Sequence, residues 1–225
     1  MRALLVETTI RNSGQGARRY VPEPAHLLGM YHILAKKGHQ VRLAAEPSAR
    51  SLSSLVRDFS PHFVGFTSYR LHCNTPLSLP DHPCVDSLQE HAFLIQAMQR
   101  QGIKIGIGGR GATLNPGHFA RAYRPDFIVK GLGEIPMMVL AGSGFDGRAI
   151  EHEDVYCGNI EDTAILQAPR GEKWIEVSFE RPYSLENHAS TARVYVQIGC
   201  FGRCIFCAED HLVNYRPLEY VLDEL

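Results

Sequence analysis

The sequence of 225 residues lacks a long apolar run and carries almost no net charge. A membrane-spanning helix needs about 18 consecutive apolar residues, and no such stretch occurs. The formal net charge of -1 provides no basic field for a nucleic acid or an anionic membrane surface. The apolar start is short and is interrupted by Glu7, which argues against a signal peptide. These absences predict a protein of the cytoplasm that binds neither membranes nor nucleic acids.

Disorder is excluded by composition, because 44% hydrophobic and 21% charged residues are ordinary globular usage. The six cysteines are unevenly placed, since Cys200, Cys204 and Cys207 fall within eight residues. A disulfide framework would spread them more evenly and would need an oxidising compartment. The cluster therefore indicates metal ligation. The remaining cysteines are interpreted as ordinary thiols: Cys73, Cys84 and Cys157.

Strand and helix patterns alternate over about the first 140 residues, which predicts an α/β fold with a doubly wound parallel sheet. Expected strands cover residues 2–8, 40–44, 62–67, 103–107 and 126–129. Expected helices cover residues 25–37, 52–59, 85–101, 116–123 and 135–140. The crossovers should be right-handed, and ligands should bind outside the carboxyl ends of the strands. Four loops reach that edge: residues 8–20, 68–70, 108–116 and 131–134.

The chain divides into three parts by pattern. Residues 1–145 form the α/β domain, and residues 146–190 are expected to be a linker with some strand content. Residues 191–225 begin a second domain, in which a strand over 192–197 leads into the cysteine cluster. The loop glycines Gly131 and Gly133 either turn the chain or let a ligand approach the backbone.

The cysteine cluster has the spacing CxxxCxxC. Three thiolates on a [4Fe–4S] cluster leave one iron without a protein ligand, which is what a reactive site needs. The alternative is a structural Cys₃His zinc site, because His211 follows Cys207 by four positions. Both interpretations stay open on the spacing alone.

This motif, with Phe206 just before the last cysteine, resembles the radical S-adenosylmethionine enzymes. The resemblance implies that Cys200, Cys204 and Cys207 each bind one iron of a [4Fe–4S] cluster. S-adenosylmethionine would chelate the fourth iron, with Phe206 packed near its adenine. Reductive cleavage would then release a 5′-deoxyadenosyl radical. The strand that precedes the motif would begin a partial (β/α) barrel.

The first 140 residues are similar to the cobalamin-binding-type, Rossmann-like domain of one branch of that family. The matching segments, in order, are residues 24–31, 37–41, 61–67, 108–116 and 126–134. The branch implies a corrin at the carboxyl edge of the sheet. Candidate cofactor contacts are Thr67, Ser68, Gly108, Gly109, Gly131, Gly133 and Glu134. For Thr67 and Ser68, helix capping is the competing interpretation.

Two features complicate the cobalamin interpretation. The DxHxxG pattern that supplies a histidine to cobalt is absent, so no residue is assigned as an axial ligand. Residues 106–111 also fit GxGxxG, which favours a dinucleotide. That fingerprint should follow the first strand of its unit, however, and here it follows the fourth. We therefore prefer cobalamin to a dinucleotide.

Only 18 residues follow Cys207, whereas a partial barrel needs about 150–200. We therefore expect an N-terminal fragment, a truncated product or one half of a split enzyme, without turnover on its own. An apolar stripe in residues 217–225 would lie uncovered: Leu218, Val221, Leu222 and Leu225.

The resemblance implies a radical S-adenosylmethionine enzyme that methylates an unactivated carbon. Its cofactors would be a [4Fe–4S] cluster, S-adenosylmethionine and cobalamin. Its partners would be a small-molecule or peptide substrate, a one-electron reductant and a second chain that completes the barrel. The alternative is a non-catalytic cofactor-binding or regulatory module with the structural zinc site.

Overall fold

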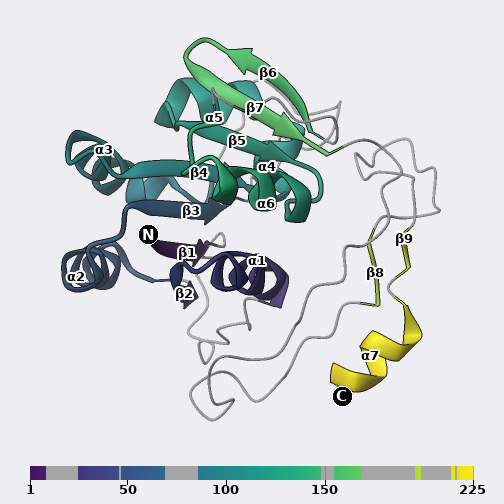
Figure 1. Cartoon of the computed structure of the whole chain (residues 1–225). Helices are drawn as coiled ribbons and strands as arrows, with labels where there is room; N and C mark the ends of the chain where they lie inside the picture. Colours follow the sequence, from purple (N-terminus) through teal and green to yellow (C-terminus); the bar gives the residue numbers. More distant parts are fainter. Residues whose placement is uncertain are drawn as a thin grey trace, which may run out of the picture.

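The computed structural model describes residues 1–8, 25–45, 47–68, 86–147, 150, 155–168, 196–198, 214–215 and 217–224. A seven-stranded sheet in the order β2-β1-β3-β4-β5-β7-β6 forms its centre (Figure 1). Neighbouring strands are parallel except for β6 and β7. The strand bounds are β1 Arg2–Glu7, β2 Gln40–Ala45, β3 Phe63–Thr67, β4 Lys104–Gly108, β5 Phe127–Lys130, β6 Tyr156–Ile160 and β7 Thr163–Gln167. The expected doubly wound α/β sheet is therefore confirmed.

Helices cover both faces of this sheet, and each face has its own apolar core. The helix bounds are α1 Ala25–Lys36, α2 Ala49–Phe59, α3 Ala92–Arg100, α4 Gly109–Leu114, α5 Pro116–Tyr123 and α6 Glu134–Gly142. Helices α1 and α6 bury Leu34 and Leu140 on one face. Helices α2 to α5 bury residues such as Leu52 and Phe119 on the other. Strand β1 is apolar on both of its faces because Leu4 packs in one core and Leu5 packs in the other.

The position of β1 fixes the switch point of the sheet. The chain leaves β1 through α1 to β2 on one side, and then returns through α2 to β3 on the other. The two crossovers diverge at the carboxyl ends of β1 and β3, which is where open α/β sheets bind ligands. Thr8 and Ser68 directly follow these two strands.

An aromatic stack lies on the α1–α6 face. Phe63 stacks on Phe127 and on Phe145, with ring centroids 5.5 and 4.3 Å apart. A side chain on Gly106 would overlap the Phe127 ring, and one on Gly65 would lie 2.9 Å from Phe63 Cζ. The two strand glycines therefore leave room for the rings.

The β6–β7 hairpin extends the sheet beyond the range predicted for the first domain. Residues 156–167 were expected within the linker, but β7 pairs in parallel with β5, and β6 pairs antiparallel with β7. Thr163 and Ala164 in β7 are buried against the sheet. The short apolar run of residues 163–166 is the sequence signal for this strand.

Two further expectations need correction. The helix expected over residues 85–101 begins only at Ala92, after a 3-10 turn at Gln89–His91. The Asp86 carboxylate accepts a hydrogen bond from the Leu88 N–H at 2.9 Å, which turns the chain before the helix. The loop expected over residues 108–116 contains α4. Helix α5 has the predicted bounds.

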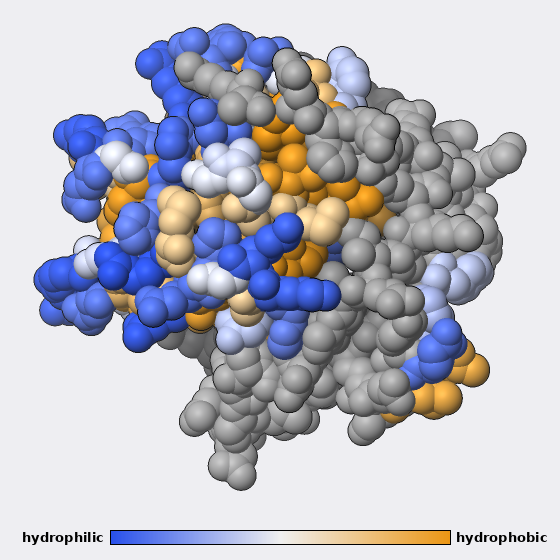
Figure 2. Space-filling view, viewed as in Figure 1, coloured by the Kyte–Doolittle hydropathy of each residue, from blue (hydrophilic) through white to orange (hydrophobic). Residues whose placement is uncertain are grey.

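Little of the expected second domain is described. Strand β8 Gln197–Ile198 pairs antiparallel with β9 Asn214–Tyr215, and helix α7 spans Leu218–Glu224. Apolar surface is exposed over α7, at the lower right of Figure 2, where Leu218 and Leu222 are exposed and Val221 is buried. Leu225 lies outside the described residues. No helix in the described ranges is long and apolar enough to cross a membrane.

Candidate functional site

The carboxyl ends of four parallel strands meet at one edge of the sheet. Thr8 follows β1, Ser68 follows β3, Gly109 follows β4 and Gly131 follows β5. The register confirms this alignment, because Val6 pairs with Phe66 and Thr67 pairs with Gly108. We call this edge, including the segment 86–88 bonded to it, the ligand edge.

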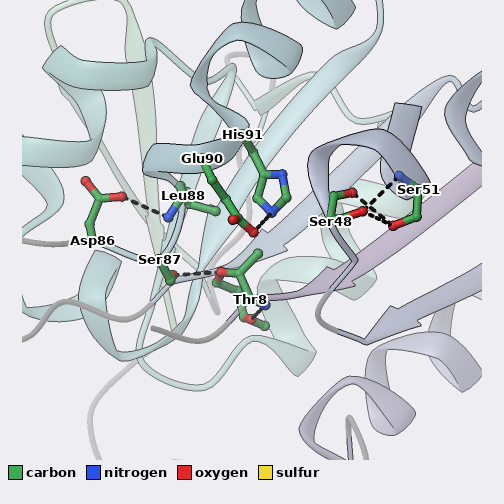
Figure 3. Close-up of polar contacts among 9 residues, drawn as sticks. Thr8, Ser48, Ser51, Asp86, Ser87, Leu88, Glu90 and His91 are labelled. Carbon is green, nitrogen blue, oxygen red and sulfur yellow. Dashed lines mark hydrogen bonds and ion pairs between the residues drawn. The ribbon is translucent and has the colours of Figure 1, made fainter. Parts of the chain in front are cut away.

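Buried hydroxyl groups join β1 and β3 at the switch point. The Thr8 N–H donates to Thr67 Oγ1 at 3.0 Å, and Thr8 Oγ1 donates to the Thr67 carbonyl at 2.6 Å. Ser87 Oγ lies 2.7 Å from Thr8 Oγ1. The dashed line between these two residues in Figure 3 marks this contact. All three side chains are buried. Thr67 was expected at this edge, whereas Ser87 was not.

Ser68 caps helix α4 from the neighbouring strand. Its Oγ accepts the Ala112 N–H at 2.9 Å, and its carbonyl accepts the Gly111 N–H at 2.8 Å. Its Oγ also donates to the Gly108 carbonyl at 2.7 Å. Of the two roles left open for Ser68, these contacts show capping. Thr67 bonds to Thr8 instead.

Replacing Ser68 with alanine should lower the free energy of unfolding by about 1–2 kcal/mol, because the buried Ala112 N–H loses its acceptor. Urea denaturation followed by circular dichroism measures this loss. The Ser53→Ala variant is the control, because Ser53 is exposed on α2. Equal stability of both variants would contradict the capping role.

The glycines of the ligand edge differ in what surrounds them. Gly109 has a φ of +85°, and a side chain there would lie 2.9 Å from the Ser68 nitrogen. A side chain on Gly133 would overlap Met30 of α1. Internal packing therefore accounts for both. Gly131 has a φ of +71°, and a methyl group on it would meet no atom within 4 Å, so its turn is open.

The same geometry weighs against the dinucleotide fingerprint. Its first glycine, Gly106, lies inside β4 and makes room for Phe127. Its last glycine, Gly111, packs against Phe119 and Ser68 and follows the start of a helix of only six residues. These glycines serve the core and the α4 cap rather than a phosphate turn.

Two other candidates lie at the edge. A methyl group on Gly108 would have Val129 as its nearest neighbour, 3.8 Å away, so this position is less crowded than Gly109. Glu134 begins α6 and is buried.

The residues expected at the metal site lie outside the described residues: Cys200, Cys204, Phe206, Cys207 and His211. Their roles therefore stay predictions. Within the described ranges, no group of three or more metal-binding side chains occurs.

Asp86 is a buried carboxylate beside Ser87. Besides the Leu88 N–H, it accepts the Tyr123 O–H at 2.6 Å and a hydrogen bond from His118 Nε2 at 2.8 Å. Burial opposes its ionisation, but the hydrogen bonds from His118, Tyr123 and Leu88 hold the pKa of Asp86 below its ordinary value. The segment ahead of α3 is thereby bonded to α5.

The lowered pKa of Asp86 predicts a loss of stability in acid. A carboxyl whose pKa is lower in the folded state stabilises the protein above its unfolded pKa, and that contribution disappears as the pH falls through the folded pKa. The stability difference between the wild type and Asp86→Asn should therefore shrink as the pH falls below the usual carboxyl range. His39, whose pKa is lowered by burial, titrates in both proteins and cancels. Urea denaturation at several pH values measures the difference, and a constant difference would contradict the prediction.

Comparison with known proteins gives likeness in structure but not in sequence. No protein-family model and no curated protein matches the chain. A structure of the radical S-adenosylmethionine methyltransferase TsrM from Kitasatospora setae, with tryptophan and an S-adenosylmethionine analogue, is similar with a TM-score of 0.68 at 19% identity. A second structure of TsrM, with cobalamin and a [4Fe–4S] cluster, has a TM-score of 0.69 at 18% identity.

The alignments cover a much larger share of this chain than of TsrM. Both alignments cover 99% of this chain, but only 44% and 46% of the TsrM chains. The chain therefore spans less than half the length of these enzymes. At this identity the likeness establishes the fold, and the chain shares the α/β architecture of that part of TsrM.

Proposed function

We propose that this chain supplies the cobalamin-binding and cluster-binding parts of a radical S-adenosylmethionine enzyme. The observation that carries the proposal is the likeness in fold to TsrM, beside the CxxxCxxC motif of residues 200–207 in the sequence. The likeness concerns the backbone fold, and the motif concerns the spacing of cysteines. Together they favour iron over a structural zinc site.

Two features of the ligand edge support a ligand at the switch point. The Gly131 turn is open, and the hydroxyls of Thr8 and Thr67 lie at the ends of adjacent strands. We propose that the corrin and its side chains contact the other candidate residues named from the sequence: Thr67, Gly108, Gly109, Gly131, Gly133 and Glu134; Ser68 instead caps α4. For Gly109 and Gly133 the contact would be made by the main chain, since packing leaves no space for a side chain.

The cluster site would be formed by Cys200, Cys204 and Cys207, with Phe206 beside the adenine of S-adenosylmethionine. Held by these residues, the cluster would supply an electron for cleavage of S-adenosylmethionine, and cobalamin would carry a methyl group. We propose methylation of an unactivated carbon in a small-molecule or peptide substrate. A one-electron reductant and the remainder of the barrel, on a second chain or a longer one, would complete the enzyme.

Titration with hydroxocobalamin tests this proposal at the ligand edge. We expect saturable binding with a change in the visible absorption of the corrin, and no competition by NAD. Saturable binding of NAD without binding of cobalamin would instead support the dinucleotide interpretation. The protein is used as the full chain, and circular dichroism confirms that it is folded in each titration.

A further inference from the structure

The hydroxyl contacts at the switch point have a defined direction. A hydroxyl group has one proton, and that of Thr8 is donated to the Thr67 carbonyl. The bond between Thr8 Oγ1 and Ser87 Oγ must therefore use the proton of Ser87. The order is Ser87 to Thr8 to the Thr67 carbonyl, and it connects the segment ahead of α3 to the ends of β1 and β3.

The Thr67 hydroxyl is held by a hydrogen bond from the main chain of Thr8. Its Oγ1 accepts the Thr8 N–H, so the orientation of Thr8 determines the orientation of the Thr67 side chain. The Thr67 O–H proton has no acceptor among the residues that the structure describes. This proton remains as a donor at the carboxyl end of β3, suited to a carbonyl oxygen of a bound ligand.

Ser87 is in turn fixed by the preceding residue. The Asp86 side chain turns the chain through the Leu88 N–H and is bonded to Tyr123 and His118 of α5. The turn presents Ser87 to Thr8 at 2.7 Å (Figure 3). Asp86 itself is buried among these donors, so it has no direct role toward a ligand.

We propose that Asp86 is a positioning residue for the ligand edge, acting through Ser87 and Thr8 on the Thr67 hydroxyl donor. The proposal rests on the proposed function, because cobalamin is the ligand expected at this edge. It adds that α5, through its hydrogen bonds to Asp86, affects the affinity of the ligand edge for cobalamin without contacting the cobalamin.

The Asp86→Ala variant should bind hydroxocobalamin about tenfold more weakly than the wild type, as expected for a misplaced hydrogen-bond donor. Asp86→Asn should restore most of the affinity. Its carbonyl oxygen can accept from Leu88 and Tyr123, and its amide can donate to the other tautomer of His118.

The matched control is Asp126→Ala. Asp126 also accepts a backbone N–H, from Ile105, and bonds to a cation, Lys104, but it lies at the opposite edge of the sheet. This variant should lose stability without losing affinity for cobalamin. Thermal unfolding of each variant separates the two effects.

A double-mutant cycle with Ser87→Ala tests the route of action. If Asp86 acts through Ser87, the Asp86→Ala change should have little further effect on affinity once Ser87 is alanine. Additive losses of cobalamin affinity in the double mutant, or unchanged affinity in Asp86→Ala, would overturn the positioning role. Cobalamin binding by the wild type would still support the proposed function in either case. Failure of the folded wild type to bind cobalamin would overturn both. If Asp86→Ala does not fold, Tyr123→Phe replaces it in this test. Tyr123→Phe removes one hydrogen-bond donor to Asp86 and should lose less affinity for cobalamin than the loss expected for Asp86→Ala.

Discussion

The Gly106→Ala variant should be less stable than the wild type by about 2–3 kcal/mol. A methyl group on Gly106 would occupy the position of the Phe127 ring and would also lie 3.0 Å from Phe63 Cε2. Neither ring can retreat freely, because Phe63 is stacked between Phe127 and Phe145 in the buried core. Close-packed interiors respond to added atoms with displaced side chains and backbone.

The same chemical change at Gly142 is the control for this prediction. Gly142 lies at the end of α6, and a methyl group there meets no atom within 4 Å. Gly142→Ala should leave stability unchanged or raise it by up to about 1 kcal/mol, because alanine favours the helix. Urea denaturation of the three proteins gives the comparison. Equal stability of Gly106→Ala and Gly142→Ala would contradict the packing described for the aromatic stack.

The Cys204→Ala variant should lose the brown visible absorption of a reconstituted [4Fe–4S] cluster. The proposed site has only three cysteine ligands, so removing one leaves two thiolates, too few to hold the cluster stably. We expect about four irons and four sulfides per wild-type chain and near-background values in the variant. Anaerobic reconstitution followed by iron and sulfide analysis measures both.

Cys157→Ala controls for general thiol chemistry. Cys157 is exposed on β6, away from the motif in sequence, and desolvation raises the pKa of its thiol. A raised pKa leaves less thiolate, which is the form that binds metals. This variant should keep the full cluster. If both variants retained equal iron, the assignment of Cys204 as an iron ligand would be wrong.

The fold could be predicted from sequence where local pattern determines it. The buried run of β1 and the Pro116 start of α5 are local signals, and both elements form as expected. Strand β7 was missed because its apolar run is short and lies among polar residues, so its pairing with β5 is decided by tertiary packing. The turn before α3 depends on one side chain, Asp86, within an otherwise helical pattern.

The candidate site was less predictable than the fold. Thr67 and Ser68 could be assigned to the ligand edge because Thr67 ends an expected strand and Ser68 directly follows it. Ser87 could not be assigned to this edge from the sequence, because its partner Thr8 is 79 positions away and only the folded sheet brings the two residues together. The pattern of glycines likewise does not distinguish a turn from close packing, and only the contact of Gly133 with Met30 does so.

The proposed function depends above all on three cysteines that hold a cluster with one iron open to S-adenosylmethionine. Electron paramagnetic resonance of the anaerobically reconstituted and reduced chain, with and without S-adenosylmethionine, tests this most directly. We predict a paramagnetic [4Fe–4S] signal that changes on addition of S-adenosylmethionine, because a new ligand binds to the open iron. One tightly bound zinc per chain and no paramagnetic signal would contradict the proposal and favour the structural Cys₃His site.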